Sequence, residues 1–150
     1  MGLRQVVVLL CALGSGCVVA NFTPTSRFQD AAYTLNDAAR WGQVDNATKF
    51  VSPTYLDAFV SRHREWGGPI SIADADLVRM KLADDRKTAT SEVALNWYDT
   101  GGVTVRNSVI TQQWEAVHGN FRLVSETIRA GDTRIFAQEE AATSGASTVQ

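Results

Sequence analysis

Cysteine and histidine are nearly absent from this chain of 150 residues. The two cysteines, Cys11 and Cys17, both lie in the first twenty residues. The rest of the chain can therefore form no disulfide, no thiolate nucleophile and no cysteine-based metal site. The two histidines, His63 and His118, lie far apart in the sequence. Because a metal ion needs several such ligands together, the sequence predicts no metal and no cofactor.

Clustered positive charge is also lacking. The 14 Lys and Arg residues are spread along the chain against 16 Asp and Glu residues, with a net charge of −2. Nucleic-acid binding requires basic residues gathered on one face, so no nucleic-acid partner is predicted. The sequence also has no glycine-rich phosphate loop, no nucleotide-binding fingerprint and no Ser–His–Asp pattern.

No apolar run is long enough to cross a membrane. The longest one near the start, residues 6–13, is far shorter than the ~20 residues that a spanning helix needs. One positive charge at Arg4 precedes it and small residues follow it. This arrangement is typical of a secretory signal peptide. We therefore expect residues 1–20 to direct export and residues 21–131 to form one domain.

Two cleavage positions fit this segment. Residues 13–17 (LGSGC) resemble the lipobox of bacterial lipoproteins, although Gly14 stands where leucine is usual. Cleavage there would make Cys17 the lipidated first residue of an envelope protein whose partner is the membrane. Alternatively, residues 18–20 (VVA) form a signal peptidase site. Cleavage after Ala20 would leave a soluble periplasmic or secreted protein. We favour lipidation of Cys17.

The first half of the chain has helical periodicity. Apolar residues three and four apart predict a helix from Ser26, as the N-cap, to Trp41, ended by Gly42. A short second helix is expected over about 44–51. Ser52-Pro53 predicts the start of a third helix, which stops before Gly67.

The second half has the alternation of β-strands. Strands are expected over about 70–83, 87–98, 103–117 and 121–129, joined by short turns. The predicted fold class is α+β, with three N-terminal helices packed on a curved four-stranded antiparallel meander. The third strand has apolar residues in both alternation sets. This predicts either a bulge that switches its face or an outer face covered by a partner, such as a second copy. Residues 132–150 are small and polar, which predicts a disordered tail.

The last predicted hairpin carries a resemblance to a known family. Gln113-Trp114, followed by residues 119–124 (GNFRLV), and the earlier Ser52-Pro53-Thr54-Tyr55 resemble the nuclear transport factor 2-like (SnoaL-like) superfamily. The resemblance extends over residues 27–129 and implies a cystatin-like α+β cone. The superfamily includes isomerases, dehydratases, hydrolases and binding modules, among them exported bacterial lipoproteins, so it implies a fold rather than a function.

Few residues are candidates for chemistry inside such a cone. Enzymes of this family usually place an Asp, His or Tyr there. Asp76 is the candidate acid or base because the alternation puts it on one strand face with the apolar residues Val78, Met80 and Leu82. A carboxylate at the solvent end of a strand is the more common case. His118 is expected to be an exposed turn residue, and His63 a residue at a helix end or core edge. The residues that could line a pocket are Tyr33, Tyr55, Asp76 and Trp97, although core aromatics mostly serve packing.

Three functions are compatible with these features. The favoured one is a membrane-tethered accessory domain without catalytic activity, which binds a protein partner or a small ligand through the sheet face or the cone mouth. The second is a cofactor-free isomerase or dehydratase, which requires a closed cavity of a few hundred Å³. The third is a homodimeric structural module with an apolar patch that includes Ile110 and Trp114. The short segment between the predicted helices leaves little room for a pocket wall, which favours the first.

Overall fold

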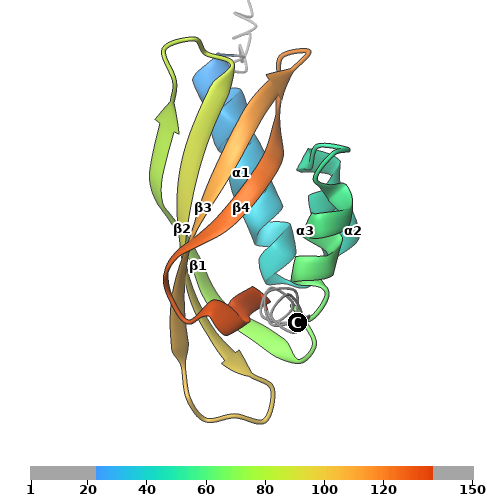
Figure 1. Ribbon diagram of the computed structural model, residues 1–150, viewed down its shortest axis with the longest axis vertical. Coiled ribbons are helices and arrows are strands. Elements are labelled where there is room, and N and C mark those ends of the chain that lie inside the picture. Colours follow the sequence, from blue (N-terminus) through green and yellow to red (C-terminus); the bar gives the residue numbers. More distant parts are fainter. Residues whose placement is uncertain (1–22, 137–150) are drawn as a thin grey trace, which may run out of the picture.

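Helices occupy the first half of the chain and strands the second, as predicted (Figure 1). This computed structural model describes residues 23–136. The strands form one antiparallel sheet in the order β1-β2-β3-β4, which confirms the α+β fold with a four-stranded meander. The elements are α1 (Pro24–Arg40), α2 (Val44–Ala47), the 3-10 helix η1 (Thr48–Phe50), α3 (Leu56–His63), β1 (Ile70–Leu82), β2 (Thr88–Asp99), β3 (Arg106–Val117), β4 (Asn120–Gly131) and the 3-10 helix η2 (Thr133–Phe136).

Helix α1 begins earlier than predicted and ends where expected. Thr23, and not Ser26, is the N-cap, since its hydroxyl oxygen accepts a hydrogen bond of 3.2 Å from the Ser26 backbone N–H. Pro24 then occupies the first turn, where its missing N–H costs nothing. At the other end Gly42 adopts a positive φ of 68°, the left-handed conformation that commonly terminates a helix.

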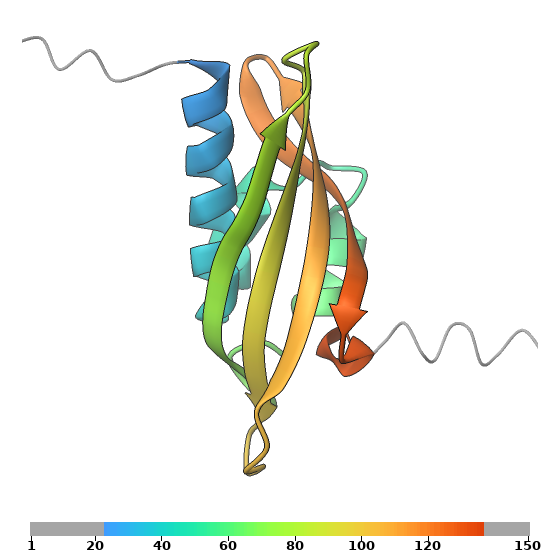
Figure 2. The ribbon, with the colours of Figure 1, turned by 90° about the vertical axis from the view of Figure 1, so that its left-hand side faces the viewer.

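Within residues 23–136, all helices lie on one side of the sheet, and no helix of this part covers the other face (Figure 2). The buried stripe of α1 packs on the inner face, where Phe28 meets Trp114 of β3 with ring centroids 5.9 Å apart. Inward-facing side chains of β2, β3 and β4 complete the core. The largest fully buried side chains include Trp97, Trp114, Phe28, Phe59 and Phe136. The interior of the cone is therefore filled by aromatic and aliphatic side chains, together with a few buried polar ones such as His63 and Gln112.

Helix α3 starts later than Ser52-Pro53 predicts. Val51 forms a parallel bridge with Leu123 of β4, and the Ser52 backbone N–H donates to the Leu123 carbonyl at 2.8 Å. These contacts hold the chain extended at the sheet edge. The helix can begin only after a turn, at Leu56. Tertiary pairing therefore overrides a local start signal.

Two irregularities in β1 determine which side chains face the core. The register against β2 shifts between Ile72 and Asp74 and again between Leu77 and Arg79. Each extra residue reverses the alternation, so apolar residues on both sides of it can point inward. Asp76 pairs with Ala94 and is exposed on the outer face. Its predicted place among the apolar residues is wrong because the second irregularity separates it from them.

Strand β3 keeps one face inward throughout. It pairs with β2 without a register shift, so the predicted bulge that would switch its face is not found there. The shifts of this part of the sheet lie in its pairing with β4. Ile110 and Trp114 are 0% and 1% exposed, so they cannot build the apolar dimer patch predicted for them.

The folded part of the chain extends beyond the predicted boundary at residue 131. Ile135 and Phe136 of η2 are buried, and the Trp66 indole N–H donates to the Ile135 carbonyl at 3.1 Å. The prediction that the tail starts at residue 132 is therefore wrong. The remainder of that tail, residues 137–150, and the predicted signal peptide with Cys17 lie outside the described residues. Among the described residues, no helix is long and apolar enough to span a membrane.

Candidate functional site

The four residues predicted to line a pocket are not brought together. Trp97 is fully buried in the core, where its indole N–H donates to the Ser108 hydroxyl at 2.9 Å. Tyr33 is 58% exposed on α1, and Asp76 is exposed on the outer face of the sheet. Of the four, only Tyr55 contacts the polar side chains around Glu126 that are described next. The sequence therefore located one member of the interior site and missed the others.

Tyr55 belongs to an inner polar cluster around Glu126, whose side chain is 0% exposed. The Tyr55 hydroxyl donates to Glu126 Oε2 at 3.2 Å, and Gln112 Nε2 donates to Glu126 Oε1 at 2.9 Å. His63 Nε2 lies 3.6 Å from Glu126 Oε2. A buried carboxylate, an imidazole and a phenol thus meet at the centre of the cone.

Gln112 connects this carboxylate to α1 and β2. Its amide exchanges two hydrogen bonds of 2.9 Å with the Asn36 amide, and its oxygen also accepts from the Ser91 hydroxyl at 2.9 Å. Among the described residues, the only buried side-chain nitrogen or oxygen without a partner is Arg40 Nε. Every side chain of the inner polar cluster therefore makes at least one hydrogen bond, as buried polar groups in a stable core are expected to do.

Burial sets the protonation of the cluster. Removal from water lowers the pKa of His63, although the Glu126 carboxylate opposes this shift. The imidazole is therefore neutral at pH 7, with Nδ1 donating to the Phe59 carbonyl at 2.9 Å. Burial, and the Glu126 carboxylate after it, raise the pKa of the Tyr55 hydroxyl, so the phenol stays protonated and donates.

The lowered pKa of His63 predicts that stability falls as pH decreases. The unfolded chain binds a proton near the ordinary pKa of 6.5, whereas the folded chain binds it only at lower pH. Below pH 6.5, proton uptake therefore favours unfolding, by up to about 1.4 kcal/mol per pH unit. Urea unfolding at pH 7.5 and pH 5.5 measures this difference. The control variant His118→Gln, at an exposed turn, should keep the dependence and His63→Gln should reduce it; the same dependence in both variants would contradict this assignment.

The cone mouth below the cluster is closed by η2. The Phe136 ring is parallel to the Trp66 ring, with an interplanar angle of 3°, and lies 5.3 Å from the His63 ring. The Arg62 guanidinium covers it at 5.1 Å. No residue of the inner polar cluster lines either of the hollows described next. The cluster has groups suited to proton transfer, and among the described residues its acid and its bases are almost completely buried: His63 is 1%, Glu126 2% and Tyr55 9% exposed.

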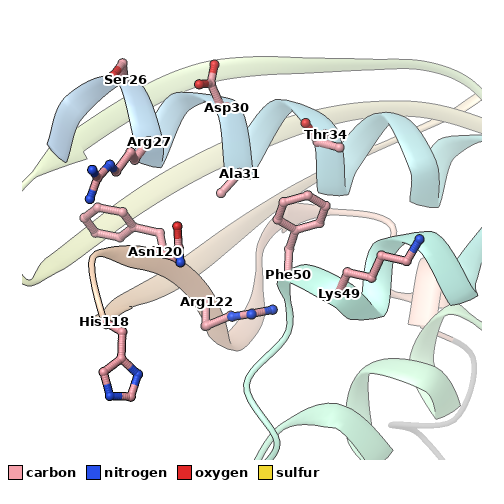
Figure 3. Close-up of a pocket in the computed structure, with 11 residues that line it drawn as sticks. Ser26, Arg27, Asp30, Ala31, Thr34, Lys49, Phe50, His118, Asn120 and Arg122 are labelled. Atoms are coloured by element: carbon pink, nitrogen blue, oxygen red, sulfur yellow. The ribbon is translucent and has the colours of Figure 1, made fainter. Parts of the chain in front are cut away.

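An open groove lies between the N-terminal half of α1, η1 and the β3–β4 hairpin (Figure 3). Its volume is about 780 Å³, and a hollow of about 340 Å³ adjoins it along α1. We call it the α1–hairpin groove. It is lined by Ser26, Arg27, Asp30, Ala31, Thr34, Lys49, Phe50, His118, Asn120, Phe121 and Arg122.

Three cations from three separate elements line this groove. Arg27 of α1 donates to the Gly119 carbonyl at 3.1 Å, and Lys49 of η1 donates to the neutral Asn46 side chain at 3.0 Å. Arg122 extends from β4 towards Phe50 and Lys49 (Figure 3). The single carboxylate of the lining, Asp30, points away from Arg122 on α1. The groove therefore offers positive charge beside the partly exposed Phe50 ring.

His118 lies at the rim of the groove in the exposed turn predicted for it. It has a φ of 49° and Gly119 one of 79°, the conformation of a two-residue hairpin turn. Its ring points away from α1 (Figure 3). Among the described residues, no group of three or more His, Cys, Asp or Glu side chains could hold a metal ion.

The comparisons with known proteins identify the class of fold. A protein of unknown function with a cystatin-like fold from Nostoc punctiforme superposes with a TM-score of 0.52 at 10% identity, covering 73% of this chain and 91% of that one. A SEC-C motif-containing protein from Rhodopseudomonas palustris gives 0.54 at 14% identity, covering 71% and 78%. A protein from Catenulispora acidiphila gives 0.51 at 11% identity, covering 76% and 95%. The chain thus has a cystatin-like fold.

This fold is the one that the resemblance to the nuclear transport factor 2-like superfamily implies. At such low identities the likeness concerns the fold alone. No protein-family model matches the sequence, and no curated protein matches it. The function must therefore be argued from the residues of this chain.

Proposed function

We propose that this protein is a binding domain without catalytic activity, exported and anchored in the cell envelope by a lipid on Cys17. One observation carries the binding role. The interior of the cone is filled and its mouth is closed by Phe136, whereas the open concavity lies on the surface between α1, η1 and β4. A protein of this design presents its groove to a ligand rather than enclosing a substrate.

The inner polar cluster supports this proposal through its hydrogen bonds. Each acid or base in it already has a partner within the protein, and Glu126 is held by Tyr55 and Gln112 at once. A general base must instead reach a proton of the substrate within hydrogen-bond distance. The isomerase or dehydratase alternative would require η2 to leave the cone mouth first.

Substitution of Cys17 by serine tests the anchor. If the lipid is attached there, Cys17→Ser is expected to abolish incorporation of labelled palmitate and to move the protein from the membrane fraction to the soluble fraction. Cys11→Ser is the matched control, since Cys11 lies within the apolar run and should leave labelling unchanged. Absence of labelling in the unmodified protein, with a mature chain that starts at Asn21, would contradict the anchor and support cleavage after Ala20.

A further inference from the structure

We propose that the α1–hairpin groove binds the phosphate of an anionic phospholipid headgroup. This inference deepens the proposed function and takes from it the membrane as the source of the ligand. The groove itself is defined by residues of the folded domain alone.

The first argument is the convergence of like charges. Arg27, Lys49 and Arg122 come from parts of the chain that are far apart, yet folding brings them to one concavity. Like charges repel, and a concave surface concentrates their field. An anion in the groove would offset this repulsion. A phosphate suits such a site because guanidinium groups donate to two of its oxygens at once.

The second argument is the contrast between Arg122 and other arginines. Arg122 is half-buried and pairs with Glu115 in the register of β3 and β4, yet its side chain makes no hydrogen bond or ion pair with any residue that the structure describes. Half-buried charges are normally compensated. Five arginines elsewhere each pair with an aspartate or a glutamate: Arg40, Arg79, Arg106, Arg129 and Arg134. The Arg122 guanidinium is therefore available to bind an anion from outside the domain.

The third argument is the shape of the groove. Of the three apolar residues of the lining, Phe50 is partly exposed, whereas Phe121 and Ala31 are only 2% and 5% exposed, so the apolar surface beneath the cations comes mainly from Phe50. The volume of about 780 Å³ exceeds what one phosphate needs. A ligand with an anionic end and an apolar body fits this combination. The glycerol and first methylene groups of a phospholipid would lie on Phe50 while the phosphate meets Arg122 and Lys49.

The fourth argument is the position of the groove. The start of α1 and the β3–β4 turn lie at the same end of the molecule (Figures 1 and 2). Residues 18–23 separate Cys17 from α1. Six residues reach at most about 20 Å when fully extended. A lipid on Cys17 would therefore hold the groove end close to the headgroups. The net charge of −2 gives the whole chain no general attraction to an anionic membrane, so binding must come from the groove.

The test uses the chain from Asn21 onwards, which lacks Cys17 and keeps the whole described core, from Phe28 to Phe136. It should sediment with phosphatidylcholine vesicles that contain phosphatidylglycerol and not with pure phosphatidylcholine vesicles. Removing one cation, as Arg122→Gln or Lys49→Gln, is expected to weaken binding about fivefold. Arg122→Lys keeps the charge but not the contact with two oxygens, so it should lose less affinity than Arg122→Gln, and added salt should reduce the affinity of the unmodified chain. Lys81→Gln is the matched control, because Lys81 is exposed on the outer face of β1.

Three results would overturn the inference. The first is equal sedimentation with both kinds of vesicle, and the second is an equal loss of affinity for Arg122→Gln and Lys81→Gln. The third is binding of glycerol phosphate to the protein without any vesicle binding, which would assign the groove to a free anion. Thermal unfolding of each variant confirms that the fold is kept. If the vesicle test fails while palmitate labelling is normal, the groove proposal is wrong and the proposed lipid anchor on Cys17 is unaffected. If vesicles bind but no labelling is found, only the anchor is wrong.

Discussion

Replacing Glu126 by alanine is expected to lower the free energy of unfolding by about 2–6 kcal/mol, since each of the two buried polar groups that it leaves unpaired costs about 1–3 kcal/mol. The substitution would leave the Tyr55 hydroxyl and the Gln112 amide without their acceptor in a region that water does not reach. It would also leave a cavity. Urea-induced unfolding followed by tryptophan fluorescence measures the loss, since Trp114 is buried on the same inner face.

Two further variants separate the hydrogen bonds from the volume. Glu126→Gln keeps the shape and one acceptor oxygen, so its loss should be smaller than that of alanine. Glu115→Ala, at an exposed position of β3, should change stability by no more than about 0.5 kcal/mol. If Glu126→Ala were as stable as Glu115→Ala, Glu126 would not be a buried member of the core and the closed cone would be incorrect.

Ending the chain at Asp132 is expected to lower the free energy of unfolding by at least as much as Glu126→Ala does. This change removes η2. The Phe136 ring, which contacts Trp66 and His63, and the Ile135 carbonyl, which accepts from the Trp66 indole, are lost with it. Loss of a buried phenylalanine side chain alone costs about 3–5 kcal/mol, and Ile135 is lost as well. The same chain ended after Phe136 should keep the stability of the full protein. Differential scanning calorimetry of the two shortened forms gives the comparison.

The double substitution Ile135→Ala with Phe136→Ala serves as a second measure of the same contact, without a change of chain length. It should reproduce most of the loss. Equal stability of the forms that end at Asp132 and Phe136 would contradict the role of η2 as part of the core. In that case the residues from 132 onwards would add nothing to the stability of the fold, as the boundary predicted from composition implies.

The fold could be predicted from the sequence because most of its helices and strands have a recognisable local pattern of apolar and polar residues. The apolar stripe of α1, the glycine at its end and the alternation of β2 and β3 each agree with the structure. The element boundaries that were wrong depend on distant contacts. Ser52-Pro53 has the composition of a helix start, but pairing with Leu123 keeps it extended. No local pattern contains that contact.

The candidate sites were harder to predict for two physical reasons. The register shift between Gln113 and Trp114 inserts Val124 into β4, so strict alternation from Leu123 would place Ser125 inside instead of Glu126. Gln112 and Asn36 gave a usable signal, as amides within otherwise apolar faces. The α1–hairpin groove gave none, because its cations lie on three elements whose proximity only the folded chain creates.

The two irregularities of β1 also bear on how the protein behaves when many copies are crowded together. An edge strand with regular free N–H and C=O groups invites another strand to add to the sheet, the usual first step of aggregation. Here the strand is interrupted twice, and the Arg40 side chain donates to the Ala73 carbonyl at the first interruption. Charged Arg79 and Lys81 follow on the outer face. The two irregularities that make the orientation of Asp76 hard to predict from the sequence thus also hinder the addition of another strand at β1.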